Sequence, residues 1–266
     1  MRVLLTGAAG SIGQVVAIGL ADRGHEIVGL DLVPPLEGVD DPWYTVDCAD
    51  ADAVAEVFAQ ERLDAVVHLA GRPDEASLPD SLHSHLVTTG ALLDAMVEHG
   101  VRRIVYASSN HAVGRTPRGD QPLGEDAAPR PDTFYGVAKV AAEAALRLYA
   151  DRYGLDAVVC RIGSFLPQPE ARRHLATWLS PGDCVRMVEA ALTAPAPGFA
   201  VLYGISANTR AWWDLAAGHR LGYHPEDDAE RYAADLPERL EDADEAAYVG
   251  GPFAGEAFYR PALDRG

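Results

Sequence analysis

The sequence predicts an α/β fold, a doubly wound parallel sheet with helices on both faces, and three observations support this prediction. A short apolar run at residues 2–6 is followed by a glycine-rich turn at 7–13 and then by a helix-like stretch. Further apolar runs recur along the chain, separated by segments with helical spacing. Strands that alternate with helices in this way form parallel sheets, because each crossover returns the chain to the same edge. A length of 266 residues with 48% apolar content fits one large domain with an ordinary core.

Charge and composition exclude several classes of partner. The chain has 40 acidic against 22 basic residues and a formal net charge of −18, so we expect no nucleic-acid partner. The apolar run after Met1 is too short to cross a membrane or to act as a secretion signal, so we expect a cytoplasmic protein with no membrane partner. The cysteines are few and widely spaced, which predicts neither disulfides nor a metal site. The sequence is compatible with a homo-oligomer but does not define one.

The first turn carries Gly7, Gly10 and Gly13 between a strand and a helix. Gly7 allows the tight turn, Gly10 lets the backbone approach a pyrophosphate, and Gly13 lets the helix pack closely. The first amides of that helix, including those of Ser11 and Ile12, would face the anion. This context predicts a dinucleotide site and a Rossmann-type fold, although a glycine turn that only connects two elements is the alternative.

A second strand, residues 26–31, ends in Asp31. Its distance from the glycine turn is close to the ~20 residues at which an acid grips the adenosine ribose diol. No arginine follows Asp31 directly, so a 2′-phosphate would be repelled and NAD is favoured over NADP. We include the adjacent Leu32 in the predicted cofactor site. A solvated loop acid is the alternative interpretation of Asp31.

Two more strands are expected to reach the cofactor. The third, residues 43–48, places Asp47 and Cys48 near the adenine. The fourth, residues 64–71, places three residues along the cofactor: Leu69, Ala70 and Gly71. His68 lies within this apolar run, and we interpret it as a core histidine with its hydrogen bonds satisfied.

A fifth strand, residues 102–107, delivers Ser109, Asn110 and His111 to the carboxyl edge, where doubly wound sheets bind ligands. We expect a helix before it, over 82–99, and a surface loop after it, over 114–131. A helix capped by Asp132 or Thr133 should then run to about residue 153, with apolar positions at helical spacing: Val137, Val140, Ala141, Ala144, Ala145 and Leu148. Strands over 156–162 and 199–203 and a helix over 181–192 complete the sheet.

Tyr135 and Lys139 are four residues apart, so on a helix they share one face. An ammonium beside a phenol favours the phenolate and lowers the tyrosine pKa, which predicts a general base. Ser109 could hold a substrate hydroxyl beside that phenolate. Such a group removes a proton from a carbinol while hydride leaves the same carbon.

The glycine turn, Asp31, Ser109, Tyr135 and Lys139 together resemble the extended branch of the short-chain dehydrogenase/reductase superfamily over the first six strands. The resemblance implies that Tyr135 is the base, that Ser109 positions the substrate hydroxyl, and that Lys139 holds the nicotinamide ribose and lowers the pKa of Tyr135. It also implies NAD as the cofactor and adds Ile162 to the cofactor site.

Four further stretches, at 108–111, 161–164, 177–180 and 206–214, resemble uronate dehydrogenases, which oxidise C1 of a hexuronic acid to an aldarolactone with NAD. The resemblance implies that Ser109, Asn110, His111 and Ser164 contact sugar oxygens and that Arg173 binds the C6 carboxylate. Independently, a guanidinium meets a carboxylate with two parallel hydrogen bonds, and an acidic protein needs such a cation for an anionic substrate. A surface position for Arg173, a solvent-facing His111, and a packing role for Trp212 and Trp213 are the alternatives.

Two stretches depart from these families. His85 stands before Thr88 and Thr89 where the extended branch commonly has Asn, and the stretch 71–74, Gly-Arg-Pro-Asp, lacks a serine that contacts substrate in uronate dehydrogenases. The preferred sugar is therefore left open.

Two other functions compete with the oxidation of a sugar acid. A sugar or nucleotide-sugar epimerase or dehydratase is disfavoured because little chain remains to bind a nucleoside, and a non-catalytic NAD sensor is disfavoured because Tyr135 and Lys139 are both present. We predict one domain over 1–266, with segments at about 164–180 and 205–266 capping the substrate and an acidic surface over 225–245.

Overall fold

The computed structural model describes residues 1–35, 37–38, 41–255 and 258. Its main element is a 7-stranded sheet of parallel strands in the order β3-β2-β1-β4-β5-β6-β9. The strands are β1 Arg2–Thr6, β2 Glu26–Asp31, β3 Trp43–Thr45, β4 Ala65–His68, β5 Arg103–Ser109, β6 Asp156–Ile162 and β9 Phe199–Gly204. The strand order reverses between β1 and β4, and such a switch point opens a crevice at the carboxyl ends of the strands. The predicted doubly wound Rossmann-type fold is confirmed.

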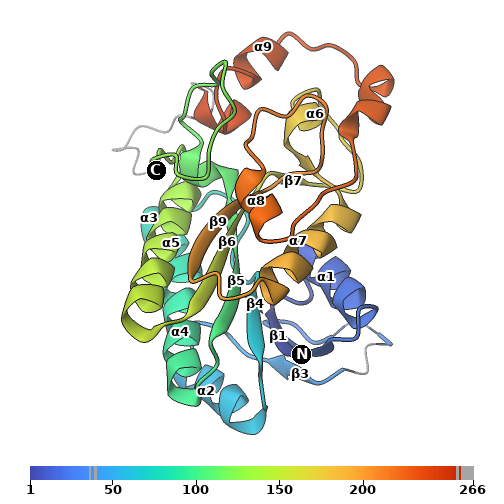
Figure 1. Cartoon of the computed structure of the whole chain (residues 1–266). Helices are drawn as coiled ribbons and strands as arrows, with labels where there is room; N and C mark the ends of the chain where they lie inside the picture. The colour runs from blue at the N-terminus through green and yellow to red at the C-terminus, as the bar shows by residue number, and fades with distance from the viewer. Residues whose placement is uncertain (36, 39–40, 256–257, 259–266) are drawn as a thin grey trace.

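Helices cover both faces of this sheet (Figure 1). On one face, three helices pack on one another: α2 Ala51–Gln60, α4 Thr88–His99 and α5 Phe134–Tyr153. On the other face, α1 Ser11–Ala21 packs against α7 Pro181–Thr193. The strands between them are buried on both sides, which explains why they appear in the sequence as continuous apolar runs.

Each face of the sheet has its own apolar core. Val16 and Leu20 of α1 join Met187 of α7 on one side. Phe58 of α2 and Leu146 of α5 join the cluster on the other side. Full burial of a side chain of this size contributes about 1.5–3 kcal/mol, so these two clusters supply most of the stability of the sheet half.

After β6 the chain leaves the sheet and forms a small cap at its carboxyl edge, at the top of Figure 1. The cap contains β7 Ser164–Phe165 paired with β8 Trp178–Leu179, the short helices α6 His174–Thr177 and α9 Asp242–Glu245, and 3₁₀ turns at Ala229–Asp235 and Gly251–Ala254. The short helix α8 Ala216–Arg220 lies lower in Figure 1, against β9. The segments predicted to cap the substrate lie in the cap and in α8, except residues 256–257 and 259–266, which are outside the described residues. Their role as a substrate cap stays a prediction.

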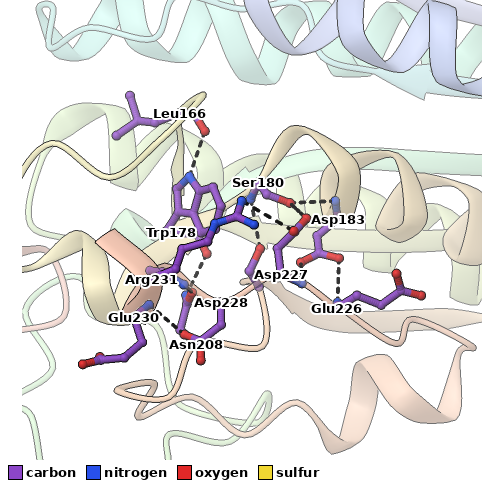
Figure 2. Close-up of polar contacts among 12 residues, drawn as sticks. Leu166, Trp178, Ser180, Asp183, Asn208, Glu226, Asp227, Asp228, Glu230 and Arg231 are labelled. Atoms are coloured by element: carbon purple, nitrogen blue, oxygen red, sulfur yellow. Dashed lines mark hydrogen bonds and ion pairs between the residues drawn. The ribbon is translucent and has the colours of Figure 1, made fainter. Parts of the chain in front are cut away.

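Polar contacts connect the cap to the start of α7 (Figure 2). The Asp183 carboxylate, whose side chain is 0% exposed, accepts hydrogen bonds from the backbone N–H groups of Glu226 and Asp227 at 2.8 and 3.0 Å. Asn208 donates to the Trp178 carbonyl at 2.9 Å and accepts from the Ala229 N–H at 3.0 Å. The acidic stretch over 225–245, expected to be solvated surface, therefore includes residues that hold the cap in place.

Three details of the sequence prediction need correction. The third strand ends at Thr45 and not at Cys48, because the chain turns away at residue 47. The helix expected over 82–99 begins earlier, with α3 Leu78–Leu82, and passes through a π-helical turn at His83–Val87 before α4. On α5 the apolar positions do not mark the buried face: Leu148 is 46% exposed, whereas Lys139 and Glu143 are buried.

Two expectations about packing are met. His68 hydrogen-bonds the Thr6 and Thr89 hydroxyls at 2.7 and 3.1 Å, as expected for a satisfied core histidine. Trp213 is buried, stacks on Trp212 at 4.0 Å between ring centroids and donates to the Ala176 carbonyl, which supports a packing role. The cysteines are free, buried thiols: Cys48, Cys160 and Cys184. Among the described residues, no helix is both long enough and apolar enough to span a membrane.

Candidate active site

The glycine turn leaves an open anion site at the start of α1. A Cβ on Gly13 would overlap the Gly7 carbonyl oxygen, so the helix approaches the turn more closely than any other residue would permit. Within the described part of the chain, the N–H groups of Ser11, Ile12 and Gly13 have no protein acceptor, and the first turn of α1 has neither a capping side chain nor an acid. These unpaired donors and the helix dipole together suit a pyrophosphate.

Asp31 lies beside the glycine turn at this site. Its two carboxylate oxygens accept hydrogen bonds from the N–H groups of Ala9 and Leu32 at 2.9 and 2.7 Å, which fixes the carboxylate between the glycine turn and the end of β2. The predicted neighbours differ in exposure: Leu32 is 67% exposed, Asp47 is exposed, and Cys48 lies in the apolar core, where burial raises its pKa to about 12. Leu69, Ala70 and Gly71 follow β4 at the rim of the same crevice.

The three predicted catalytic residues converge at the carboxyl edge of the sheet. Thr133 caps α5 by accepting from the Gly136 N–H at 2.9 Å, and this sets Tyr135 in the first turn of the helix. The Lys139 Nζ donates to the Ala107 carbonyl at 2.6 Å and lies 5.4 Å from the centroid of the Tyr135 ring. Ser109, at the end of β5, is buried, and its hydroxyl accepts from the His111 N–H at 3.2 Å and lowers the pKa of Tyr135. Ile162 is buried at the end of the neighbouring β6.

The lowered pKa that was expected for Tyr135 is wrong in direction. Burial raises the pKa of Tyr135 to about 12, and the hydrogen bond from Ser109 offsets only part of this effect. Burial also lowers the pKa of Lys139 to about 7, against the opposing charge of Glu143. Loss of water therefore outweighs the attraction between ammonium and phenolate that the spacing of the two residues suggested.

Glu143, one turn after Lys139, belongs to a buried group that the sequence did not reveal. It pairs with Arg161 at 2.8 Å and accepts from the Ser108 hydroxyl at 2.5 Å. Arg161 and Glu143 are almost fully buried, so each neutralises a charge that would otherwise be costly. This pair lies behind the reactive edge of β5 and β6 and keeps a negative charge close to Lys139.

Two histidines flank the Tyr135 ring. His85 meets it edge to face at 5.1 Å between centroids, and His111 does so at 5.9 Å. His85 comes from the π-helical turn, and its Nε2 pairs with the Arg72 carbonyl at 3.0 Å. Burial and the charge of Lys139 lower the pKa of His85 to about 3, so this ring is neutral at working pH. The residue that departs from the extended branch therefore packs directly against the predicted base.

The predicted substrate residues lie around this centre. The Asn110 amide donates to the Val249 carbonyl at 3.3 Å, and His111 Nδ1 lies 3.0 Å from the Asp132 carboxylate oxygens. Ser164 shares a hydrogen bond of 2.9 Å with the Thr177 hydroxyl. These contacts come from the 3₁₀ turn Asn110–Val113 after β5, from β7 and α6, and from the C-terminal segment, which are far apart in the sequence.

Arg173 is the predicted carboxylate ligand, and its surroundings are distinctive. Its guanidinium lies against the backbone of Gly251, where a Cβ would come within 2.6 Å of Nε. Among the residues that the structure describes, no carboxylate is within salt-bridge distance of it, and no side-chain hydrogen bond satisfies it. Burial lowers its pKa, while the charges of Glu245 and Asp132 act in the opposite direction. Arg173 stands at the start of α6, as the alternative interpretation expected, but its side chain is half-buried and not fully exposed.

Several residues at this site were not found from the sequence. Glu75 accepts from the N–H groups of Phe134 and Tyr135 at 3.0 and 3.2 Å, so a loop after β4 holds the first turn of α5. Phe253 meets the His111 ring edge to face at 4.8 Å. Asp132 could have been noticed in the sequence, because it stands next to the residue that caps α5. Nothing in the sequence linked Glu75 or Phe253 to the site. The described residues contain no group of three or more side chains suited to a metal ion.

Comparison with known proteins agrees with this geometry. Residues 3–197 match the model of the NAD dependent epimerase/dehydratase family. The chain belongs to this family. The resemblance to extended short-chain dehydrogenases seen in the sequence is thereby confirmed, and the cofactor is NAD.

Individual relatives show which enzymes of the family the chain is similar to. The chain is 37% identical to a uronate dehydrogenase of Pseudomonas putida over 258 residues, and this aligned region covers 95% of each chain. It is 34% identical over 253 residues to an NAD-dependent glucose-6-phosphate dehydrogenase of Haloferax volcanii, over 86% of this chain and 95% of that one. A crystal structure of a variant uronate dehydrogenase from Agrobacterium tumefaciens, in complex with NAD, superposes with a TM-score of 0.88 at 36% identity, over 98% and 99% of the two chains. This member of the family is an NAD-dependent oxidoreductase similar to uronate dehydrogenases.

Proposed function

We propose that the chain oxidises a hexuronic acid, of the glucuronate or galacturonate type, at C1 to the aldarolactone. The observation that carries this proposal is Arg173, a partly buried guanidinium without a carboxylate partner among the described residues. A buried cation of this kind costs free energy unless an anion meets it, and a bidentate carboxylate is its best match. In a chain of net charge −18 such a position is suited to an anionic substrate.

The cofactor site would use the open amides of α1 for the pyrophosphate and Asp31 for the adenosine ribose. The full set that we propose is Gly7, Gly10, Ser11, Ile12, Gly13, Asp31, Leu32, Asp47, Cys48, Leu69, Ala70, Gly71, Tyr135, Lys139 and Ile162. When bound, NAD supplies the hydride acceptor and a positive charge on its nicotinamide ring. A cation near Tyr135 favours the phenolate, which opposes the rise in pKa that burial causes.

Tyr135 would take the proton of the C1 hydroxyl while the C1 hydrogen leaves as hydride. Loss of that proton and hydride converts the cyclic hemiacetal into a lactone, with the ring oxygen retained. Ser109, whose hydroxyl lowers the pKa of Tyr135, would hold the C1 oxygen between the two hydroxyl groups. Lys139 would stabilise the phenolate with its ammonium, held in place by the Ala107 carbonyl.

Asn110, His111 and Ser164 would contact sugar oxygens, and Arg173 would bind the C6 carboxylate at the far end of the ring. Two ends of the substrate are then fixed, the carboxylate in the cap and C1 at the sheet edge. Fixing both ends orients the reacting bond and lowers the entropic part of the barrier. The segments 164–180 and 205–255 would form the cap over this site.

The likeness to a glucose-6-phosphate dehydrogenase gives a second candidate. A guanidinium binds phosphate as well as carboxylate, so an aldose with a phosphate at C6 would use the same two ends of the site. The alternative of a sugar or nucleotide-sugar epimerase is less well supported, because α7 and β9 complete the sheet and only short elements remain for a nucleoside.

The test is a substrate panel with purified protein and NAD: glucuronate, galacturonate, glucose 6-phosphate, neutral aldoses and UDP-sugars. NADH formation with the hexuronates, and much less with the neutral aldoses, is the expected result. If glucose 6-phosphate gives more NADH than the hexuronates do, the proposed substrate becomes an aldose 6-phosphate, and Arg173 would bind its phosphate instead of a carboxylate. An epimer formed from a UDP-sugar without net NADH would contradict the dehydrogenase function.

A further inference from the structure

Asp132 is a fully enclosed carboxylate at the start of the catalytic helix. Its side chain is 0% exposed, and both oxygens lie 3.0 Å from the Nδ1 of His111. Its other side-chain partner is the Thr133 hydroxyl, which donates at 3.3 Å. A carboxylate removed from water in this way needs a strong partner, and His111 is the group that supplies it.

Two glycines from distant segments enclose the carboxylate. A Cβ on Gly114, after β5, or on Gly250, in the C-terminal segment, would overlap the Asp132 carboxylate group. The Gly250 N–H donates to the Gly114 carbonyl at 2.9 Å, so the two backbones are joined beside Asp132. Any larger residue at either place would displace the carboxylate from His111.

Two aromatic rings also contact His111. Its ring meets Tyr135 at 5.9 Å and Phe253 at 4.8 Å between centroids, both edge to face, and its side chain keeps 16% of its surface exposed. An ionised carboxylate can only accept, so the proton between Asp132 and His111 belongs to Nδ1. In the neutral ring this leaves Nε2 without a proton, as a hydrogen-bond acceptor on the side of the ring away from Asp132.

We propose that Asp132 is a positioning residue that fixes the orientation and tautomer of His111, so that Nε2 accepts a hydrogen bond from a hydroxyl of the sugar substrate. The inference rests on the proposed function, because it assigns the chemistry of one contact in that same site. Through Gly250 and Phe253 it also makes the fit of the C-terminal segment part of substrate recognition. A sugar that lacks the matching hydroxyl, or carries an acceptor there, would be bound less well.

A double-mutant cycle tests whether Asp132 acts through His111. We expect Asp132→Asn to raise KM for the sugar about tenfold with little change in the Kd of NAD, since an amide can donate to Nδ1 and reverse the polarity of Nε2. His111→Ala should raise KM to a similar extent. The double variant should be no worse than His111→Ala alone, within about twofold. A full additional effect of Asp132→Asn in the His111→Ala background would overturn the proposal.

Glu189→Gln is the matched control, because Glu189 also pairs with a histidine, His25, at 2.8 Å, but lies in α7 on the sheet half, away from the site. It should lower stability slightly and leave KM unchanged. If Glu189→Gln raises KM as much as Asp132→Asn does, the effect reports loss of a carboxylate–histidine pair in general and the proposal fails.

A measurement without substrate separates this inference from the proposed function. Long-range ¹H–¹⁵N spectra of histidine-labelled wild-type protein at pH 8, with the signal assigned by its absence in His111→Ala, report which ring nitrogen carries the proton. A proton on Nδ1 alone is expected. A proton on Nε2 overturns the inference whatever the enzyme oxidises, and if the panel identifies another sugar, the same cycle is run with that sugar.

Discussion

The sheet half and the C-terminal cap bury their residues in different ways. Around the sheet, two continuous apolar clusters fill the space between the strands and the helices on either face. In the cap, the apolar clusters are small and centre on Trp213 and Trp178. Directional polar contacts connect the cap elements instead, among them the Asp183 carboxylate and the Asn208 amide (Figure 2).

Because of this difference, single substitutions should have different effects in the sheet half and in the cap. Apolar burial is non-directional and spread over many side chains, so the sheet half should keep its cofactor site through most single polar changes. A cap held by a few enclosed polar groups loses more when one partner is removed, because the other remains buried and unsatisfied. The cap carries Arg173, whereas the sheet half carries Tyr135, Lys139 and the cofactor cradle, so substrate affinity and NAD affinity should respond to different residues.

The largest expected effect is on the sheet side. Tyr135→Phe keeps the ring and its contacts with the two histidines but removes the group that takes the proton, so kcat should fall by about 10³-fold. The Kd of NAD, measured by calorimetry, should stay near the wild-type value. An active Phe variant would show that Tyr135 is not the base.

The next effect is on the cap side. Arg173→Ala should raise KM for a hexuronate by about 100-fold, because two charge-assisted hydrogen bonds are lost, while NAD affinity is unchanged. Arg173→Lys is the matched control and should recover part of the loss, since it restores the charge without the bidentate geometry. Equal activity of the Ala variant towards uronates would remove Arg173 from the site.

Asp183→Asn tests the comparison itself. It should lower the local stability of the cap by about 2 kcal/mol, which corresponds to roughly 30-fold faster hydrogen exchange in the 205–231 segment. Exchange in β1, β4 and β5 should be unaffected. Equal acceleration in the sheet would mean that the two halves unfold as one unit.

Asp31→Ala should weaken NAD binding by about tenfold, through loss of the charged group expected at the ribose diol. KM for the sugar, at saturating NAD, should not change. The glycine turn also loses its bond from the Ala9 N–H, so circular dichroism should establish that the fold is retained. An unchanged Kd for NAD would place the ribose elsewhere.

The smallest effect is a pH dependence. Lys139 has a pKa of about 7 and Tyr135 a pKa of about 12, so the fully protonated pair loses its first proton near pH 7. One proton then remains on the pair, and in the active form Lys139 carries it while Tyr135 is a phenolate. Activity should therefore rise with pH: kcat/KM is expected at about half its plateau at pH 7 and about a tenth at pH 6. Lys139→Met should remove this limb, and a profile that falls as pH rises through 7 would contradict the assignment.

The fold and the convergence of Ser109, Tyr135 and Lys139 could be predicted because their signals are local. The glycine turn, Asp31 and the spacing of Tyr135 and Lys139 each depend on a few neighbouring residues within one strand, turn or helix. The face that α5 buries could not be predicted in this way. Lys139 and Glu143 lie inside because Ala107 and Arg161 receive them there, and both partners come from other strands.

By itself, the sequence determined the order of strands and helices, the glycine turn between the first strand and the first helix, and the pairing of a tyrosine with a lysine, because hydrophobic period and short spacings encode them directly. Tertiary structure decided the rest. Enclosure reversed the expected shift of the tyrosine pKa, brought Asp132, Gly250 and Phe253 around His111, and left the Arg173 guanidinium without a carboxylate partner among the described residues. These features depend on how strongly side chains are buried where segments distant in the sequence pack together, and local sequence patterns do not predict that burial.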